Sequence, residues 1–151
     1  MKILIDTNVV LDAIADRKPF NKDAQRIFLL AASEKLEGFL TANCMTDIYY
    51  VTRKYLTDTD AREALRKLFH IFTVIDVRGT DCETALDLPM QDYEDAVVFI
   101  CARKAGVEYI ITRDNEFLKA KSTPPTISPT DFLKLFKEQD SCLIFSYEGN
   151  P

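Results

Sequence analysis

The sequence predicts an α/β protein in which helices pack on both faces of a mostly parallel sheet. Short runs of β-branched and apolar residues alternate with longer segments in which apolar residues recur every three or four positions. No internal repeat or low-complexity linker breaks this alternation, which is typical of a parallel sheet with crossover helices. A chain of 151 residues with 47% hydrophobic content is long enough for one such domain with a sizeable core.

In the first half of the chain, capping and breaking residues set the expected boundaries. Asn21 is a candidate N-cap for the second helix, and Gly38 is a candidate C-terminal glycine for the same helix. The segment FTVIDV is β-branched and apolar, which predicts a central strand. The elements expected here are a strand at 3–5, helices at 8–15 and 21–36, a strand at 39–41, helices at 43–56 and 58–72, and the strand at 72–77.

The second half continues the pattern. Gly106 stops one helix, and Pro129 is suited to the first position of the last helix. The expected elements are helices at 81–88 and 92–105, a strand at 108–112, a loop with one helical turn at 113–121, a strand at 125–128 and a helix at 129–137. The domain is therefore expected to cover 1–138. The tail 139–151 is left open as an edge strand, a partner-binding segment or a disordered end.

Composition excludes several classes of protein. The net charge of −5 argues against a broad basic nucleic-acid surface, although carboxylates gathered around divalent cations also make a chain acidic. The four cysteines form no C-x-x-C pair, so reduced thiols are expected, with Cys101 in the core. No apolar run is long enough to cross a membrane and no signal peptide is evident, which predicts a cytoplasmic protein.

Two common kinds of active site are also excluded. The four glycines lie far apart, so neither a dinucleotide-binding G-x-G-x-x-G motif nor a P-loop is present. The single histidine, His70, falls on the polar side of its helix and is expected at the surface. It is poorly placed to serve a Ser-His-Asp hydrolase.

Four acids fall where a ligand would bind. In an open parallel sheet, ligands bind beyond the carboxyl ends of the strands. Asp6 follows the first strand, and Asp114 follows the strand at 108–112. Asp92 and Asp95 stand in the first turn of the helix at 92–105.

A fifth acid, Asp47, lies inside a helix with largely apolar neighbours along the axis, where a carboxylate is costly unless it meets a cation or hydrogen-bond donors. Each acid also has a purely structural interpretation. Asp92 is a possible N-cap, Asp95 a first-turn acid that complements the helix dipole, and Asp114 a turn residue. Asp47 would face solvent if the helix register were shifted by one residue.

As a set, these acids indicate a metal site. Clustered carboxylates repel and raise each other's pKa, so they need compensation. With no cysteine or histidine ligand set, oxygen ligands of this kind favour Mg²⁺ or Mn²⁺. Such a site activates a bound water and clamps a phosphodiester, which gives hydrolysis without a protein nucleophile.

Four segments resemble the motifs of the PIN domain family, metal-dependent ribonucleases that include the toxins of VapBC-type toxin–antitoxin pairs. They come in the order and spacing of that family, and the resemblance covers roughly residues 1–138. The segments are LIDTNVVLD at 4–12, MTDIYYV at 45–51, DYEDAVVFICA at 92–102 and YIITRDNEF at 109–117.

The resemblance implies a role for each matching position. Asp6, Asp95 and Asp114 correspond to metal-ligating acids, with Asp92 as an accessory ligand. Asp47 stands where the family most often has Glu, so its carboxylate is set back by about one bond. Asn8 corresponds to the polar residue that supports Asp6, and Thr112 to a residue that orients the scissile phosphate or a water. The implied sheet has about five parallel strands in the order 3-2-1-4-5, with helices on both faces.

The resemblance further implies an endoribonuclease acting on a structured RNA such as tRNA, a homodimer, and inhibition by a cognate antitoxin. Candidate phosphate contacts are the basic residues Arg17, Lys18, Lys22, Arg53, Lys54 and Arg113.

Two rival functions stay open at this point. One is a phosphatase that uses Asp6 as a covalent nucleophile. Such chemistry usually requires a second acid two positions after the nucleophile, where this chain has Asn8. The other is a catalytically weak or inactive PIN-like module that serves as a nucleic-acid-binding or scaffold protein. Its best support is that Asp47 stands where the family most often has Glu.

Overall fold

Five parallel strands form the centre of the molecule, in the order β3-β2-β1-β4-β5, which confirms the expected topology. The computed structural model describes residues 1–147, and the side chains of residues 1–137 and 139. The strands are β1 (Lys2–Ile5), β2 (Glu37–Thr41), β3 (Thr73–Ile75), β4 (Tyr109–Ile111) and β5 (Thr126–Ile127).

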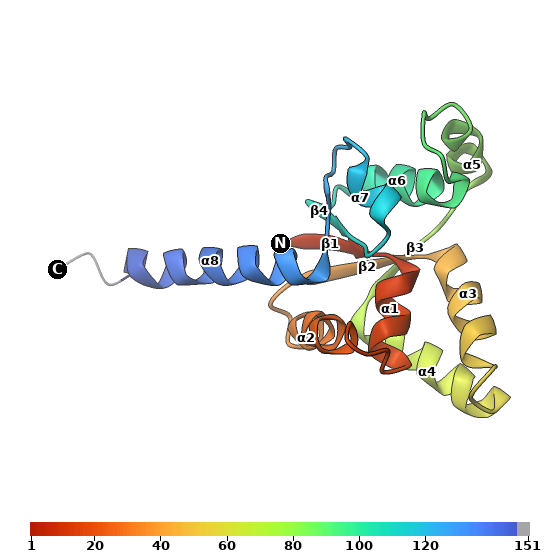
Figure 1. The fold of residues 1–151 in the computed structure, drawn as a ribbon, viewed down its shortest axis with the longest axis horizontal. Coiled ribbons are helices and arrows are strands. Elements are labelled where there is room, and N and C mark those ends of the chain that lie inside the picture. Colours follow the sequence, from red (N-terminus) through yellow and green to blue (C-terminus); the bar gives the residue numbers. More distant parts are fainter. Residues whose placement is uncertain (148–151) are drawn as a thin grey trace.

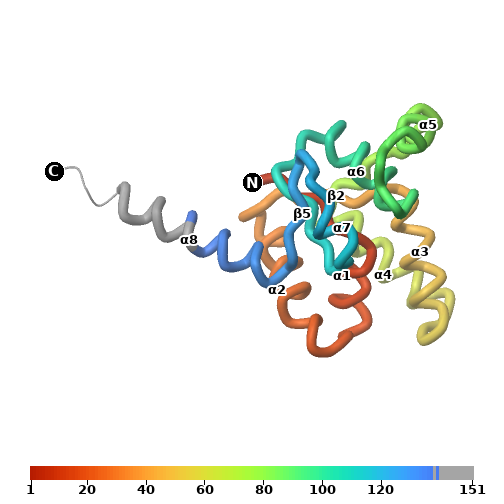
Figure 2. Tube along the Cα trace, turned by 45° about the horizontal axis from the view of Figure 1, so that its top comes forward, coloured from red at the N-terminus to blue at the C-terminus, as the bar shows by residue number. Residues whose placement is uncertain are grey.

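Helices cover both faces of this sheet (Figure 1). One face carries α6 and α7, with α5 packed on α6, and the other carries α1, α2 and α4. The start of α8 packs against α2, and the two lie side by side in both views (Figures 1 and 2). The helices are α1 (Thr7–Ile14), α2 (Asn21–Ala32), α3 (Ala42–Thr52), α4 (Asp58–Ile71), α5 (Gly79–Ala85), α6 (Tyr93–Ala105), α7 (Asn115–Lys119) and α8 (Pro129–Tyr147).

Alternation along the strands builds two cores. In β1, Ile3 and Ile5 face the core formed with α1, α2 and α4, whereas Leu4 faces the core formed with α6. All three are buried, because a parallel sheet is covered on both faces. β1 is therefore the central strand, and the residues that follow it emerge in the middle of the sheet edge.

The second helix is shorter than expected. It ends at Ala32, because Glu34 takes a left-handed conformation with φ 57° and starts the turn into β2. Asn21 is the first helical residue and not the N-cap, and its side-chain amide donates to Asp16. Gly38 does not close this helix. It lies within β2, where a methyl group would come 2.5 Å from Cδ1 of Phe72.

Three other expectations were wrong in position or length. The strand expected in the centre of the sheet is β3, which lies at its edge and covers only Thr73–Ile75. The third helix ends at Thr52, four residues earlier than expected. The last helix, expected to end at residue 137, continues to Tyr147, and residues 148–151 lie outside the described part of the chain.

Other expectations hold. His70 is exposed and Cys101 is buried, and the three cysteines with described side chains are free thiols. Within the described residues, none of the helices combines the length and apolar character that a membrane span requires.

Candidate active site

The acids converge at the carboxyl-terminal edge of the sheet, where α1 and α3 begin (Figure 1). Asp6 links β1 to α1, and Asp114 follows β4, which pairs with β1. Asp92 and Asp95 lie at the start of α6, on the opposite face from α1. The parallel topology therefore brings together acids from three separate segments of the sequence.

Asp6 is held on both of its carboxylate oxygens. Oδ1 accepts a hydrogen bond from the backbone N–H of Thr7 at 2.8 Å, so Asp6 caps α1. Oδ2 accepts hydrogen bonds from the Asn8 amide at 2.8 Å and from the Thr112 hydroxyl at 2.7 Å. Burial raises the pKa of Asp6, and the donors from Thr112, Thr7 and Asn8 oppose that effect. The side chain is therefore fixed in one orientation.

Thr112 and Asn8 connect this acid to the loop after β4. The Thr112 hydroxyl, fully buried, donates its proton to Asp6 and accepts the backbone N–H of Asp114 at 3.0 Å. The side-chain oxygen Oδ1 of Asn8 accepts a hydrogen bond from the backbone N–H of Arg113 at 3.2 Å. Since the one hydroxyl proton of Thr112 is used on Asp6, its observed contacts position the two acids.

Asp92 and Asp114 both cap helices, which is the structural role expected for Asp92, whereas the structural role expected for Asp114 was that of a turn residue. Asp92 Oδ1 accepts the backbone N–H of Asp95 at 3.1 Å and caps α6. Asp114 Oδ1 accepts the N–H groups of Glu116 and Phe117 and caps α7. No hydrogen bond from a described residue reaches the second oxygen of either side chain. Capping and ligand binding are therefore compatible at both positions.

Asp47 is half-buried and lies near this cluster. It lies close enough to Glu94, the second residue of α6, to contribute to the raised pKa of that side chain. Burial and the nearby charges of Asp47, Asp6 and Asp92 raise the pKa of Glu94. Glu94 is the site residue that the sequence analysis missed. The available signal was the run of three acids in DYED at the start of one helix.

Burial and mutual repulsion both disfavour the ionised form of these acids. Burial, followed by the charges of Asp6, Asp92, Asp114 and Glu94, raises the pKa of Asp95 to about 7. Among the described residues, no lysine or arginine forms a salt bridge with any of these acids. The cluster therefore carries negative charge that the described side chains do not neutralise.

Arg113, a candidate phosphate contact, is occupied elsewhere. Its guanidinium forms a bidentate pair with Asp12, which is fully buried in α1. It also lies over the ring of Phe20, with Cζ 3.9 Å from the ring centroid. These contacts hold the side chain on Asp12 and not on Asp114, the acid next to it in sequence.

The other basic candidates lie farther along the chain. Arg17 and Lys18 belong to the connection after α1, and Lys22 to the first turn of α2. Lys18 and Lys22 are exposed, whereas Arg17 is half-buried. The eight residues of α1 separate this group from Asp6 by roughly 12 Å. Arg53 and Lys54, just after α3, are also exposed.

Comparison with known families identifies the fold. The sequence model of the PIN domain family matches residues 2–116. This range is more than half of the chain and includes all of the acids described above. The chain belongs to the PIN domain family. The residues at this sheet edge are therefore the candidate active site of a PIN domain.

Similar proteins include several from toxin–antitoxin pairs. Ribonuclease VapC1 of Aquifex aeolicus (strain VF5) is 23% identical over 121 residues, which are 77% of this chain and 83% of that protein. The structure of DNA-bound VapBC from Salmonella typhimurium has a TM-score of 0.63 at 16% identity, covering 85% of this PIN domain chain and 98% of that chain. The structure of VapC20 from Mycobacterium tuberculosis, described as a sarcin-ricin loop cleaving toxin, has a TM-score of 0.57 at 17% identity. The match covers 72% of this chain and 86% of that chain.

Proposed function

We propose that this PIN domain is a Mg²⁺- or Mn²⁺-dependent endoribonuclease that hydrolyses phosphodiester bonds with a metal-activated water. The observation that carries the proposal is the cluster of Asp6, Asp47, Asp95 and Asp114, gathered at one sheet edge without a neutralising cation from the described protein. The ribonuclease named among its relatives supports the same activity.

The donor set fits a hard divalent cation. All the site acids offer carboxylate oxygens, the ligand type that Mg²⁺ and Mn²⁺ prefer. Among the described residues, no three acid, imidazole or thiol groups are already gathered closely enough to form a complete ligand set. The pKa of Asp95 is nevertheless raised first by burial and then by neighbouring acids, whose charge a bound cation would compensate. We propose Asp6, Asp95 and Asp114 as ligands, with Asp47 and Asp92 beside them.

When bound, such an ion lowers the pKa of a water and polarises the phosphate that the water attacks. The chain's own contribution is orientation. Asn8 and Thr112 fix Asp6 through its Oδ2 oxygen, and Thr112 also holds the backbone at Asp114. Because the hydrogen bonds of Asp6 are already formed, this side chain would lose little conformational freedom on binding a metal ion. Asn8 and Thr112 would therefore stabilise the metal-bound site.

The substrate in this proposal is a structured RNA such as tRNA. Exposed Lys18 and Lys22, with Arg17, offer phosphate contacts about one helix length from Asp6. We assign Arg113 to positioning the loop between Thr112 and Asp114, since its guanidinium is held by Asp12.

Metal removal and restoration test the activity. Purified protein is treated with a chelator, dialysed, and incubated with tRNA and with a single-stranded RNA, with and without Mn²⁺ or Mg²⁺. The expected result is internal cleavage that stops after chelation and returns with either ion. Cleavage that persists in chelator would contradict the metal mechanism. No cleavage with either ion would favour a non-catalytic nucleic-acid-binding module.

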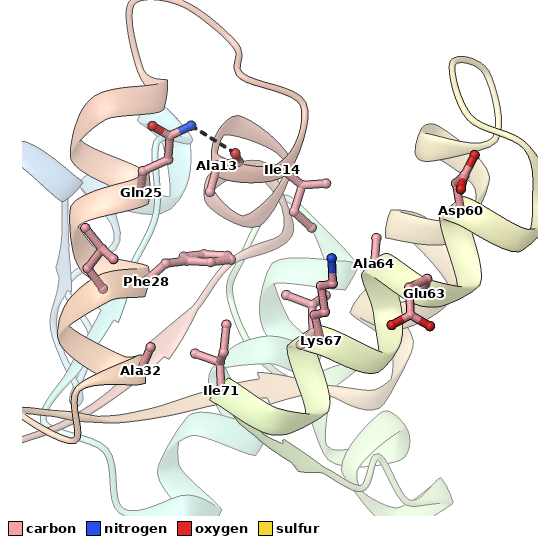
Figure 3. A pocket seen from close by; sticks show the side chains of 12 residues that line it. Ala13, Ile14, Gln25, Phe28, Ala32, Asp60, Glu63, Ala64, Lys67 and Ile71 are labelled. Carbon is pink, nitrogen blue, oxygen red and sulfur yellow. Dashed lines mark hydrogen bonds between the residues drawn. The ribbon is translucent and has the colours of Figure 1, made fainter.

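We also propose that the protein is a toxin inhibited by a cognate antitoxin, and that it forms a homodimer. The antitoxin is supported by the likeness of the chain to structures of VapBC complexes. An apolar groove of about 700 Å³ between α1, α2 and α4 offers a surface for the antitoxin (Figure 3). Phe28, Ile14 and Ile71 point into it, and Leu29 at its rim is 68% exposed.

Growth measurements test this partnership. Expression of the chain alone should arrest growth, and co-expression of the neighbouring antitoxin gene should restore it. Leu29→Asp should keep the arrest and weaken the rescue, because a charge at the rim of the groove disfavours an apolar partner. The matched change Leu86→Asp, at an equally exposed leucine outside the groove, should be rescued normally. Normal rescue of both variants would exclude this groove.

A further inference from the structure

A pocket with both polar and apolar walls lies next to the loop that carries Asp114. Its volume is about 310 Å³, near the lower end of the range of roughly 300–1,000 Å³ that is usual for small-ligand sites. Three segments form it: the start of α2 with the residue before it, the loop after β4 with α7, and the start of α8. Arg113 and Asn115 line the pocket and flank Asp114 in sequence, so a group bound there would lie beside the candidate active site.

Arg113 gives this pocket hydrogen-bond donors that are fixed in place. Its Nε and Nη2 bond to Asp12, and its guanidinium lies over the ring of Phe20. The third nitrogen, Nη1, makes no hydrogen bond to a described residue, and the side chain is 30% exposed. Because Asp12 already balances the charge of the guanidinium, the free N–H groups suit a neutral acceptor better than a phosphate.

Asp23 supplies an acceptor to the same pocket. Its Oδ2 accepts a hydrogen bond from the Thr130 hydroxyl at 2.5 Å, which joins the first turn of α2 to the start of α8. Its Oδ1 makes no hydrogen bond to a described residue. An ionised carboxylate only accepts hydrogen bonds, so this oxygen repels a phosphate and favours a ligand that carries N–H groups.

Phe20 adds an aromatic wall. Its side chain is 43% exposed, although it is large and apolar. The guanidinium of Arg113 lies over this ring with Cζ 3.9 Å from the centroid, so the ring and the guanidinium form one stacked unit at the pocket wall. Aromatic rings and guanidinium planes are the surfaces on which proteins stack unpaired RNA bases. The pocket therefore combines a stacking surface with a fixed donor and a free acceptor.

We propose that this pocket binds a guanine base of the RNA, from a nucleotide next to the scissile phosphate. The inference rests on the proposed ribonuclease function. Guanine carries the acceptors N7 and O6, which match the N–H donors of Arg113, and the adjacent donors N1–H and N2–H₂, which match the carboxylate of Asp23. Adenine and cytosine have an amino group without a neighbouring N–H, and uracil has one N–H between two acceptors. Guanine thus fits this donor and acceptor set best.

Binding of labelled pentanucleotide RNAs to the full chain tests the pocket without depending on cleavage. Fluorescence anisotropy is measured in chelator at low ionic strength, with four uridines around a central guanosine, inosine or 7-deazaguanosine. Inosine lacks the N2 amino group, and 7-deazaguanosine lacks the N7 acceptor. Each replacement should weaken binding to the wild type by at least about fivefold.

Asp23→Asn should bind the guanosine and inosine RNAs equally, because it loses the carboxylate while its amide oxygen can still accept from Thr130. Phe20→Ala should weaken binding of all three RNAs, because the stacking surface is lost. Asp60→Asn is the matched control. Asp60 is also a first-turn acid that accepts a hydrogen bond from a threonine hydroxyl, but it lies in α4 outside this pocket, so the preference for guanosine should stay.

Equal binding of the three RNAs to the wild type, or no binding of any of them, would overturn the guanine pocket. A preference for guanosine over inosine that folded Asp23→Asn retains would overturn it as well. These results leave the proposed metal-dependent cleavage intact, since that activity is measured separately with Mn²⁺ or Mg²⁺. Guanosine-selective binding without cleavage in either ion would contradict the proposed nuclease and keep the pocket.

Discussion

The guanidinium of Arg113 forms a bidentate pair with the buried carboxylate of Asp12, with Nε 2.5 Å from Oδ2 and Nη2 3.0 Å from Oδ1. Asp12 is inaccessible to solvent, and Arg113 lies between the site residues Thr112 and Asp114. The pair therefore anchors the loop after β4 to α1. The backbone N–H of Arg113 also bonds to Asn8, which joins the same loop to the support of Asp6.

Arg113→Met should lower the free energy of unfolding by about 3 kcal/mol, because it leaves a buried carboxylate without a partner. Urea unfolding followed by circular dichroism measures the change. Asp12→Asn/Arg113→Met removes the charge as well and should recover part of the loss. Equal stability of the wild type and Arg113→Met would show that the pair contributes nothing to the fold.

Gly38→Ala should also destabilise the protein, by about 1–3 kcal/mol. Its new methyl group would come 2.5 Å from the ring of Phe72, which is itself packed edge-on against Phe28 at 4.8 Å between centroids. The penalty should shrink in a Phe72→Leu background, where the ring is absent. If Gly38→Ala lowered the free energy of unfolding equally with Leu and with Phe at position 72, the loss would have a cause other than this contact.

The acid cluster should make the metal-free protein less stable as pH rises. Asp95 keeps its proton in the folded state up to a pKa of about 7, compared with an ordinary value of 3.8. Between these values the folded state binds more protons than the unfolded state, so the free energy of unfolding falls with increasing pH. This stabilising contribution is complete below about pH 4 and lost above pH 7. The raised pKa values of Asp6 and Glu94 act in the same direction.

Thermal unfolding in chelator at pH 5 and pH 8 measures this effect. Asp95→Asn should raise the midpoint at pH 8 by roughly 2–4 °C, because it removes the repelled charge. Asp131→Asn is the contrasting control, since Ser128 and Lys134 lower the pKa of that exposed carboxyl. A metal-free wild type that is more stable at pH 8 than at pH 5, by an amount that Asp95→Asn leaves unchanged, would contradict the electrostatic account.

Much of the site followed from the sequence because a parallel sheet orders its strand ends. A buried strand that stops at Asp6 and another that stops before Asp114 must deliver those residues to one edge. The acids come from segments far apart in the chain, so only this topological rule connects them. The alternating burial of Ile3, Leu4 and Ile5 then makes β1 central.

Other features depend on contacts that local patterns do not encode. Glu94 follows from how α6 faces α3, and in sequence it is an ordinary first-turn acid. The partner of Arg113 lies 101 residues away. Apolar, β-branched residues suit an edge strand as well as a central one, which is why β3 was misplaced. The left-handed Glu34 ends α2 where the sequence favours more helix.

The most direct test of the central claim is the rate of RNA cleavage by Asp6→Asn in saturating Mn²⁺, measured under single-turnover conditions. Asp6→Asn keeps the shape of the side chain but removes a charge that the site needs for its cation, so the rate should fall by at least about 100-fold. Asp87→Asn, at an exposed position outside the cluster, should cleave like the wild type. Cleavage by folded Asp6→Asn at the wild-type rate would contradict catalysis by this acid cluster.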